Sequence, residues 1–312
     1  MRNQNFDAYS VYRKQVEKIA ANYFLEKRES GKDYSVQDKY PYILKNSNEW
    51  NKNIIQDNVV KNIKALKAKA KDDINPFPLH KYLHHGLSSQ AMLFNLFGDA
   101  LINNDYAFFQ DVFQFQDIQI DNKYKLKFEH SERKTFNENQ QQPTSFDFAV
   151  YDKTGVNKSV FVEAKYVETE FGGCSAIKGG ECDGLNPLSN SDLCYLKHKG
   201  RNYWELMKKY DLDVAYKNSP ICPFVIYYQF YRELMFALEN NGYFVILIDK
   251  RNPAFERYTD IGKRGLIPIL LNQIPSELQK EIKIIYIQDV LPVLEKYGYR
   301  WVGKFREKYG MI

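Results

Sequence analysis

Two short apolar segments separated by a polar turn constrain the fold of this 312-residue chain more than any other feature. In residues 144–152, Phe146, Phe148 and Val150 alternate with polar or small residues such as Asp147. A period of two residues is that of a β-strand whose successive side chains point to opposite faces. The pattern therefore predicts a strand with an apolar face and Asp147 on the other face.

The second segment, VFVEAK, places Glu163 and Lys165 two residues apart, so both project from the same side of a strand. The stretch between the segments, DKTGVNK, contains Gly155 and Asn157, residues that favour a tight turn over a long crossover. The sequence thus predicts an antiparallel hairpin whose register can set Asp147 beside Glu163.

Two carboxylates held close together repel each other and stay ionised only if a cation lies between them. Magnesium, a hard ion that prefers oxygen ligands and keeps several waters, suits Asp147 and Glu163. Lys165 would then orient or deprotonate a water molecule, or neutralise charge developing on a phosphate. The alternative is a solvated strand face with a cross-strand ion pair. The apolar residues around the charges favour the first interpretation, phosphodiester hydrolysis, because a buried strand seldom contains an unpartnered carboxylate.

At these residues the sequence resembles the PD-(D/E)xK nuclease superfamily, which has the restriction-endonuclease-like fold. Asp147 matches the first acidic position, and Glu163, Ala164 and Lys165 match the (D/E)xK tripeptide. The chain departs from the pattern at the residue before the aspartate, which is Phe146 where the motif has proline.

A looser similarity, over about residues 86–249, is to bacterial proteins described as restriction endonucleases of this superfamily. The resemblance implies an α/β fold with a mixed central β-sheet flanked by helices. It also implies a magnesium site with Asp147 and Glu163 as ligands, Lys165 as the catalytic lysine and manganese as a substitute ion. The carbonyl oxygen of Ala164 is a candidate further ligand.

Two more polar residues are candidates for the same site. Ser88 is a credible N-cap of a helix, and Gln90 lies on the apolar stripe of that helix, where it needs a polar partner. The resemblance offers the metal site as that partner, and an ordinary structural hydrogen bond is the alternative. Nucleases of this fold also recruit a third carboxylate; Glu129, at the end of a regular strand pattern, is favoured over Glu132.

Four cysteines follow the predicted catalytic lysine, three of them in a glycine-rich stretch. No CxxC pair is present, so free reduced cysteines are the favoured interpretation. The alternative is a structural zinc ion, with the last cysteine or His198 as the fourth ligand. The residues concerned are Cys174, Cys182, Cys194 and Cys222.

Basic side chains near aromatic residues are candidates for DNA contact. One cluster precedes Tyr203 and Trp204, and a second lies in a predicted loop at residues 250–265. For the first cluster a helix start with a buried tryptophan is an equal alternative. The candidate residues are Lys197, Lys199, Arg201, Arg251 and Arg257.

The remaining pattern predicts a helical N-terminal region, residues 1–75, before a nuclease domain, residues 76–312, with a Cys/Gly-rich insertion at about 172–195. A helix containing Val11, Val16, Ile19, Ala20 and Phe24 and a second helix over residues 47–71 are expected in the first region. The second region is expected to contain strands at residues 112–120, 124–129, 243–249 and 282–287. A helix beginning at Pro223 and ending with Gly242 at its C′ position is also expected there, and its Gln229 and Arg232 would reach DNA or the sheet.

A composition of 44% apolar and 15% aromatic residues supports a sizeable core, and a net charge of +5 is compatible with a nucleic-acid partner. Because no continuous apolar stretch predicts a secretory signal or membrane span, we expect a soluble, cytoplasmic protein. The predicted function is a magnesium-dependent endonuclease of restriction or phage defence acting on double-stranded DNA, with a homodimer as the means of cutting both strands. A DNA repair or end-processing exonuclease and a catalytically inactive nucleic-acid-binding protein are the alternatives.

Overall fold

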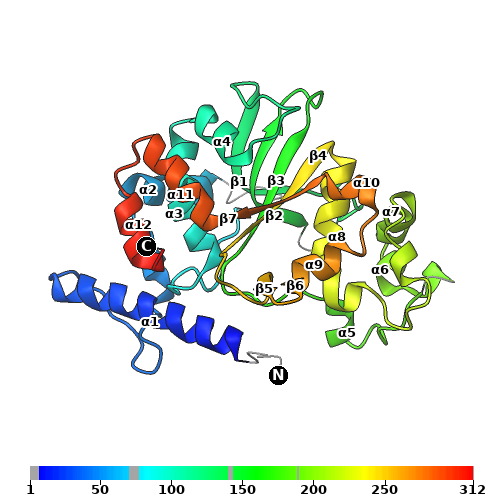
Figure 1. Cartoon of the computed structure of the whole chain (residues 1–312), viewed down its shortest axis with the longest axis horizontal. Coiled ribbons are helices and arrows are strands. Elements are labelled where there is room, and N and C mark those ends of the chain that lie inside the picture. The colour runs from blue at the N-terminus through cyan, green and yellow to red at the C-terminus, as the bar shows by residue number, and fades with distance from the viewer. Residues whose placement is uncertain (1–6, 70–76, 140–142, 188–189, 312) are drawn as a thin grey trace.

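The computed structural model describes residues 7–69, 77–139, 143–187 and 190–311, and its strands lie between two groups of helices (Figure 1). Within these residues, five strands form one sheet in the order β1-β2-β3-β4-β7. The first three strands are antiparallel, and β3, β4 and β7 are parallel. The bounds are Tyr124–Glu132 (β1), Thr144–Asp152 (β2), Ser159–Lys165 (β3), Gly242–Ile248 (β4) and Ile282–Tyr286 (β7), and a separate hairpin pairs Arg257–Thr259 (β5) with Gly262–Arg264 (β6). The predicted mixed sheet flanked by helices is confirmed.

Each face of the sheet is covered by its own hydrophobic core. Helices from both ends of the chain cover one face: α1 (Ala8–Glu29), α2 (Asp57–Lys69), α3 (Ser89–Ile102), α4 (Tyr106–Phe113), α11 (Ile287–Lys296) and α12 (Val302–Tyr309). The other face is covered by α7 (Tyr203–Lys209), α8 (Phe224–Glu239) and α9 (Leu266–Leu271). The remaining short helices are η1 (Ser47–Asn53), α5 (Ser175–Lys178), η2 (Ser191–Leu193), α6 (Tyr195–His198), η3 (Val214–Tyr216) and α10 (Ser276–Gln279).

The two central strands explain why the sequence pattern was so apolar. Every residue of β3 and of β4 is buried, as is usual for strands covered by helices on both sides. Ala164 and its alternate neighbours face the core under α3, whereas Phe161 faces the core under α8. Glu163 and Lys165 are thus charged residues in a strand that is closed to water along its whole length.

Two predicted elements are corrected by the structure. The expected strand at residues 112–120 is instead the end of α4 followed by a loop. Phe108, Phe109, Val112 and Phe113 recur at helical spacing and are buried, and Gln114 ends the helix in the left-handed conformation. A short apolar run does not by itself distinguish a strand from a helix, which is the reason for the error.

The expected helix over residues 47–71 is also wrong as a single element. An extended Ile54 ends η1 before α2 begins, so the segment forms two helices. Residues 70 and 71 of the predicted helix lie outside the described residues. The predicted apolar face of α1 is partly wrong, because Val11 is exposed and Tyr12 is buried in its place.

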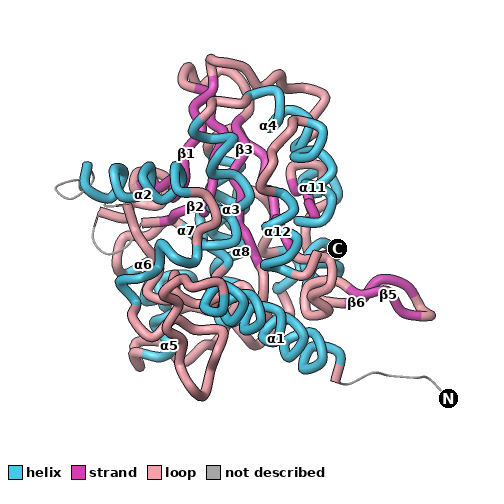
Figure 2. The backbone as a smooth tube through the Cα atoms, turned by 90° about the vertical axis from the view of Figure 1, so that its left-hand side faces the viewer, coloured by secondary structure: helices cyan, strands magenta, loops and turns pink. Residues whose placement is uncertain are grey.

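Two smaller predictions about the second half of the chain are wrong. Helix α8 ends before a left-handed Asn241, not at Gly242, which is already the first residue of β4. The predicted loop at 250–265 contains the β5–β6 hairpin, which Figure 2 shows projecting from the body of the molecule.

The predicted division of the chain near residue 75 falls largely on residues outside the described part and stays a prediction. Val16 of α1 and Val59 of α2 are fully buried in the same core as residues of the sheet. None of the described helices combines the length and the apolar character that crossing a membrane requires.

Candidate active site

The site lies where β2 and β3 separate. The strands pair from Val150 opposite Val160 to Phe148 opposite Val162. One residue further on, the carboxylate of Asp147 accepts a hydrogen bond of 2.8 Å from the backbone N–H of Ala164. An acidic side chain therefore takes the place of a backbone acceptor at this point, which fixes Asp147 against β3.

Strand β1 changes face at the same level. Glu129 lies between the pairs Phe128–Phe148 and His130–Phe146 of the β1–β2 register and has φ of 51°, in the left-handed region that non-glycine residues rarely adopt. As a result Phe128 joins the core under α3, whereas the ring of His130, only two residues later, packs in a tilted arrangement against Phe161 in the other core. Such strain costs about 1–3 kcal/mol and is found preferentially at functional sites.

The predicted apolar face of β2 is corrected by this change. Phe148 and Val150 lie in the core under α3, but Phe146 lies in the core under α8, where its ring centroid is 5.1 Å from that of Phe161. The alternation is therefore broken at Asp147, because β2 follows the distortion of its partner β1.

Lys165 and Glu163 are joined to each other and to helix α8. The ammonium of Lys165 lies 2.7 Å from an oxygen of Glu163, and both side chains are 7% exposed. Lys165 also donates to the amide oxygen of Gln229 at 2.9 Å, and the amide nitrogen of Gln229 donates to Glu163 at 2.7 Å. The same amide lies 2.8 Å from Glu233. The helix thus holds the two charged groups of β3 in one orientation.

Gln90 is brought to the third carboxylate. Its amide nitrogen donates to Glu129 at 2.5 Å, and its oxygen accepts the backbone N–H of His80 at 2.9 Å. The predicted N-cap at Ser88 is present, with its hydroxyl accepting from Ala91. Glu132 instead accepts bonds from the backbone and hydroxyl of Thr135, outside the site.

All five residues predicted to be catalytic line one cavity of about 320 Å³. The cavity receives residues from β1, β2, β3, α3 and α8 and from the loop before α3. Its acidic and basic lining residues, with the two amides, are Glu129, Asp147, Glu163, Glu168, His80, Lys165, Arg232, Gln90 and Gln229.

The carboxylates of the cavity repel one another. Burial, followed by the charges of Glu163 and Glu129, raises the pKa of Asp147 well above its usual range. Burial also raises the pKa of Glu129 to about 8, although the hydrogen bond from Gln90 opposes the shift. For Lys165, burial lowers the pKa, but the neighbouring carboxylates, Glu163 first, outweigh it and raise the value overall. One ammonium group thus faces several acids that resist ionisation.

This donor set fits a hard divalent cation. Magnesium needs only one or two protein carboxylates, and water supplies the other oxygen ligands. Asp147, Glu163 and Ala164 all line the cavity, and a cation there would relieve the repulsion that raises the pKa of Asp147. In the described part of the chain, no three His, Cys, Asp or Glu side chains are already arranged to hold a metal ion together. The fit therefore rests on the pair of carboxylates on β2 and β3.

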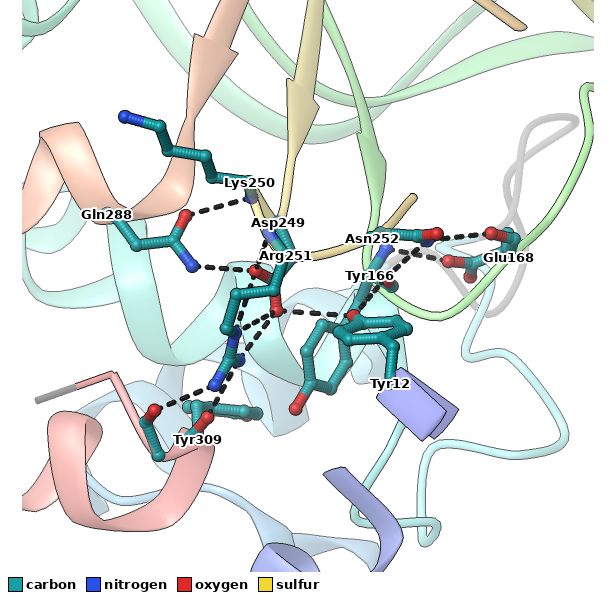
Figure 3. A network of polar contacts seen from close by, with 10 residues as sticks. Tyr12, Tyr166, Glu168, Asp249, Lys250, Arg251, Asn252, Gln288 and Tyr309 are labelled. Atoms are coloured by element: carbon teal, nitrogen blue, oxygen red, sulfur yellow. Dashed lines mark hydrogen bonds and ion pairs between the residues drawn. The ribbon is translucent and has the colours of Figure 1, made fainter. Parts of the chain in front are cut away.

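A polar network fixes the chain beyond Lys165 (Figure 3). The fully buried Asp249, at the end of β4, donates its backbone N–H to the carbonyl of Lys165 at 3.3 Å, and its carboxylate lies 2.6 Å from Arg251. The hydroxyl of Tyr12 in α1 bonds both to Asp249, at 3.2 Å, and to the carbonyl of Tyr166, at 2.7 Å. Residues distant in sequence thereby hold the end of β3.

The network includes Arg251, one of the predicted DNA contacts. Besides Asp249, the guanidinium of Arg251 donates to the carbonyls of Tyr309 and Gly310 at 2.9 and 2.7 Å. Arg201 is buried and donates to the carbonyl of Asn137. These internal contacts argue against DNA contact by Arg251 and Arg201, which remains untested.

The other predicted basic contacts lie nearer the surface. Lys197 is paired with Asp192 at 3.1 Å and Glu205 at 3.0 Å, and Lys199 is exposed. Arg257 is exposed on the projecting β5–β6 hairpin. Beside the first cluster, Tyr203 and Trp204 are buried at the start of α7, so the structural alternative holds for these aromatic residues.

A comparison with known proteins covers most of the chain. A family model described as "Restriction Endonuclease associating with ARP" (REase-ARP) matches residues 10–310. No curated protein and no solved structure gives a significant match. The matched span includes every strand and helix that lines the cavity.

Proposed function

The chain belongs to the REase-ARP family, a family of restriction-endonuclease type, and from that premise we propose that it is a magnesium-dependent endonuclease that cleaves double-stranded DNA in restriction or phage defence. The observation that supports this most strongly is the meeting of Asp147, Glu163 and Lys165 in one cavity. The distance of 2.7 Å between Lys165 and Glu163 places an ammonium beside the proposed metal ligands.

In the proposed site, the metal ion and the lysine have separate roles. Asp147, Glu163 and the carbonyl of Ala164 would hold Mg²⁺, which supplies positive charge for phosphodiester hydrolysis and can be replaced by Mn²⁺. Lys165 has a raised pKa and is therefore protonated at neutral pH. As an ammonium, Lys165 would position the attacking water and neutralise charge developing on the phosphate.

The other polar residues of the cavity keep these groups in place. Gln229 contacts both Lys165 and Glu163, so it fixes the direction of the ammonium. Glu129, with a pKa of about 8, is mostly protonated at neutral pH and adds little negative charge to the site. Gln90 orients Glu129 through its amide.

The substrate would reach the cavity through groups that suit a phosphate backbone. Arg232 lines the cavity, with its guanidinium 4.9 Å from the ring of Tyr228 and 4.0 Å from Glu138. Arg257 on the β5–β6 hairpin and Lys199 are candidates for contacts further along the duplex. Two copies of the chain would be needed to cut both strands with one site each.

The experiment is incubation of closed circular plasmid and of genomic DNA with the protein in Mg²⁺, in Mn²⁺ and in chelator. Linear or discrete products in either metal, and none in chelator, are expected. An Asp147→Asn variant should give no product, and Glu170→Gln, which changes an exposed carboxylate outside the cavity, should behave as wild type.

Other results would favour the alternatives. Degradation of linear DNA with the circle left intact would indicate an exonuclease. Binding of DNA without cleavage under any of these conditions would indicate a catalytically inactive nucleic-acid-binding protein.

A further inference from the structure

The four cysteines of the chain converge in space. Cys174, Cys182, Cys194 and Cys222 come from four separate points: before and after α5, before α6 and before α8. All four line one cavity of about 10 Å³. None of them forms a disulfide. Because Cys222 lines the cavity and His198 does not, the thiol is the better candidate for the fourth position of the set.

The size of this cavity limits what it can contain. A space of roughly 10–15 Å³ corresponds to about one water molecule. A metal ion without its waters is smaller than that, whereas a hydrated ion or an organic molecule is larger. The remaining lining is apolar, with Ala176, Ile177, Leu196 and Phe224 among its residues, so a water molecule would find few polar partners there.

Backbone groups point at three of the sulfur atoms. The N–H of Gly184 lies 3.4 Å from the sulfur of Cys182, two residues earlier. The N–H of Ala176 hydrogen-bonds Cys174 and the N–H of Phe224 hydrogen-bonds Cys222, again two residues earlier. Hydrogen bonds to the ligand atoms are the outer contacts that orient and tune metal ligands.

These donors are poorly matched to neutral thiols, which are weak acceptors. They suit thiolates instead, the form in which cysteine binds a metal ion.

The segment around the cysteines contains little regular structure. Helices α5 and α6 are four residues each, far shorter than the length at which an isolated helix is stable. Leu185 and Leu193 are 63% and 76% exposed, so these two side chains add little apolar burial to that of Ala176 and Phe224. Loop-rich segments of this kind are commonly held by disulfides or by a structural metal ion.

We propose that Cys174, Cys182, Cys194 and Cys222 bind one structural zinc ion. Zinc is held tetrahedrally by thiolates in closed structural sites, with Zn–S distances of about 2.3 Å. On binding, each thiol gives its proton to solvent and forms a sulfur–zinc bond, so four protons leave, no electron is transferred and the site has a charge of −2.

Formation of the site requires the cysteine side chains to turn inward. No group of three or more metal-ligating side chains stands at binding distances among the residues that the structure describes. The cavity that all four cysteines line supplies the room for the ion.

The zinc site is separate from the acidic cavity but bears on it through α8. The two cavities share no lining residue. Cys222 lies two residues before Phe224, the first residue of α8, and the same helix presents Gln229 to Lys165 and Glu163. The zinc ion would fix the start of the helix that orients the proposed catalytic lysine.

The test is metal analysis of the full-length protein, purified from zinc-supplemented cells and passed through a desalting column. We expect one zinc per chain, released when a mercurial reagent titrates the thiols. Refolding with Co²⁺ should give visible d–d bands and a near-ultraviolet thiolate-to-cobalt band, which only sulfur ligands produce.

Variants identify the ligands. The double variant Cys174→Ser/Cys222→Ser should lose the zinc and the thiolate–cobalt band. Ser175→Ala, an exposed hydroxyl beside Cys174, and Asp147→Asn, in the acidic cavity, should both keep them. Zinc retained by the double variant, or lost by Asp147→Asn, would overturn the assignment.

The wild-type measurement decides the case even if the double variant fails to fold. Wild-type protein that contains less than a tenth of an equivalent of zinc, gives no thiolate–cobalt band and has four freely titrating thiols would refute the proposal. DNA cleavage in Mg²⁺ does not enter this test, so the proposed nuclease activity stands or falls separately.

Discussion

At the scale of single residues, the candidate site is an anionic cavity that depends on one contact between β2 and β3 and one contact within β3. Asp147 accepts the N–H of Ala164, and Lys165 pairs with Glu163. Because the first contact fixes the carboxylate to β3, replacement of its charge can be separated from loss of its position.

Asp147→Asn is expected to abolish metal binding with little effect on stability. The asparagine oxygen can still accept the N–H of Ala164, but the negative charge that attracts a cation is gone. Titration calorimetry with Mg²⁺ or Mn²⁺ should show affinity lower by about 10-fold or more. Wild-type affinity in the variant would contradict the role of Asp147 as a ligand, and Glu170→Gln is the matched control.

Glu129 predicts a distinct pH dependence of stability. Its pKa is about 8 in the folded chain and 4.5 in a solvated carboxyl, so between these values the unfolded chain has lost a proton that the folded chain keeps. Folding therefore becomes less favourable as pH rises from about 4.5 to 8, by up to about 5 kcal/mol. Glu129→Gln removes this penalty.

Urea unfolding in chelator at pH 5 and pH 8 measures the effect. The variant should gain stability over the wild type at pH 8 and much less at pH 5. An equal difference at both pH values would show that Glu129 does not titrate in this range.

Some of the site residues could be predicted from the sequence, and others could not. Asp147, Glu163 and Lys165 could be predicted together because two adjacent strands place them locally. Gln229 was assigned to DNA or the sheet and Glu233 was not singled out, because α8 is about 60 residues further along the chain and its approach depends on packing. The only sequence signal was polar residues at helical spacing, Gln229 and Glu233, on an otherwise apolar helix.

At the scale of elements, β3 is supported at its C-terminal end by two sets of contacts. Helix α8 holds its charged side chains, and the polar network of Asp249, Arg251 and Tyr12, called here the strand-end network, holds the backbone beyond Lys165 (Figure 3). The hydrogen bonds from α8 explain how a fully buried strand can contain two charged side chains.

The strand-end network predicts that Arg251→Ala acts on stability and not on DNA affinity. Removal of the guanidinium leaves the buried Asp249 without its ion pair, at a cost of about 3–5 kcal/mol. Arg257→Ala, on the exposed hairpin, should leave unfolding unchanged and reduce the salt dependence of DNA binding by about one phosphate contact.

Denaturant unfolding and DNA binding at several salt concentrations distinguish the two arginines. If Arg251→Ala weakened DNA binding while its unfolding remained that of the wild type, its assignment to the network would be wrong.

The sequence predicted the elements with strong periodicity or unbroken apolar runs, such as β2, β3, β4 and β7. The prediction failed where the same apolar pattern suits both a strand and a helix. The residues around Val112 suit a strand by their composition, but they pack as the last turn of α4 against α11. The face change at Glu129 was also beyond prediction, because a left-handed glutamate is imposed by the surroundings of the strand and not by its own sequence.

At the scale of the whole molecule, both ends of the chain converge on the strand-end network. Tyr12 of α1 reaches Asp249 and Tyr166, and Arg251 reaches the carbonyl of Gly310. The family match, over residues 10–310, spans the same contacts. We therefore expect α1 to be part of one cooperative structure.

Deletion of residues 1–30 tests this and the predicted boundary near residue 75. The truncation removes Val16, Ala20 and Phe24, whose side chains are buried, and the hydroxyl of Tyr12. The fragment should unfold at a lower temperature in calorimetry, and its cleavage activity should fall with the loss of support at Tyr166. A fragment as stable as the full chain would show that α1 folds as a separate unit.

The most direct measurement is the rate of plasmid cleavage in Mg²⁺ by wild type and Lys165→Ala, with DNA affinity measured in parallel. If Lys165 stabilises charge during hydrolysis, the variant should bind DNA as the wild type does and cleave it about 10²–10³-fold more slowly. Equal cleavage rates for the two proteins would contradict the assignment of this cavity as the nuclease site.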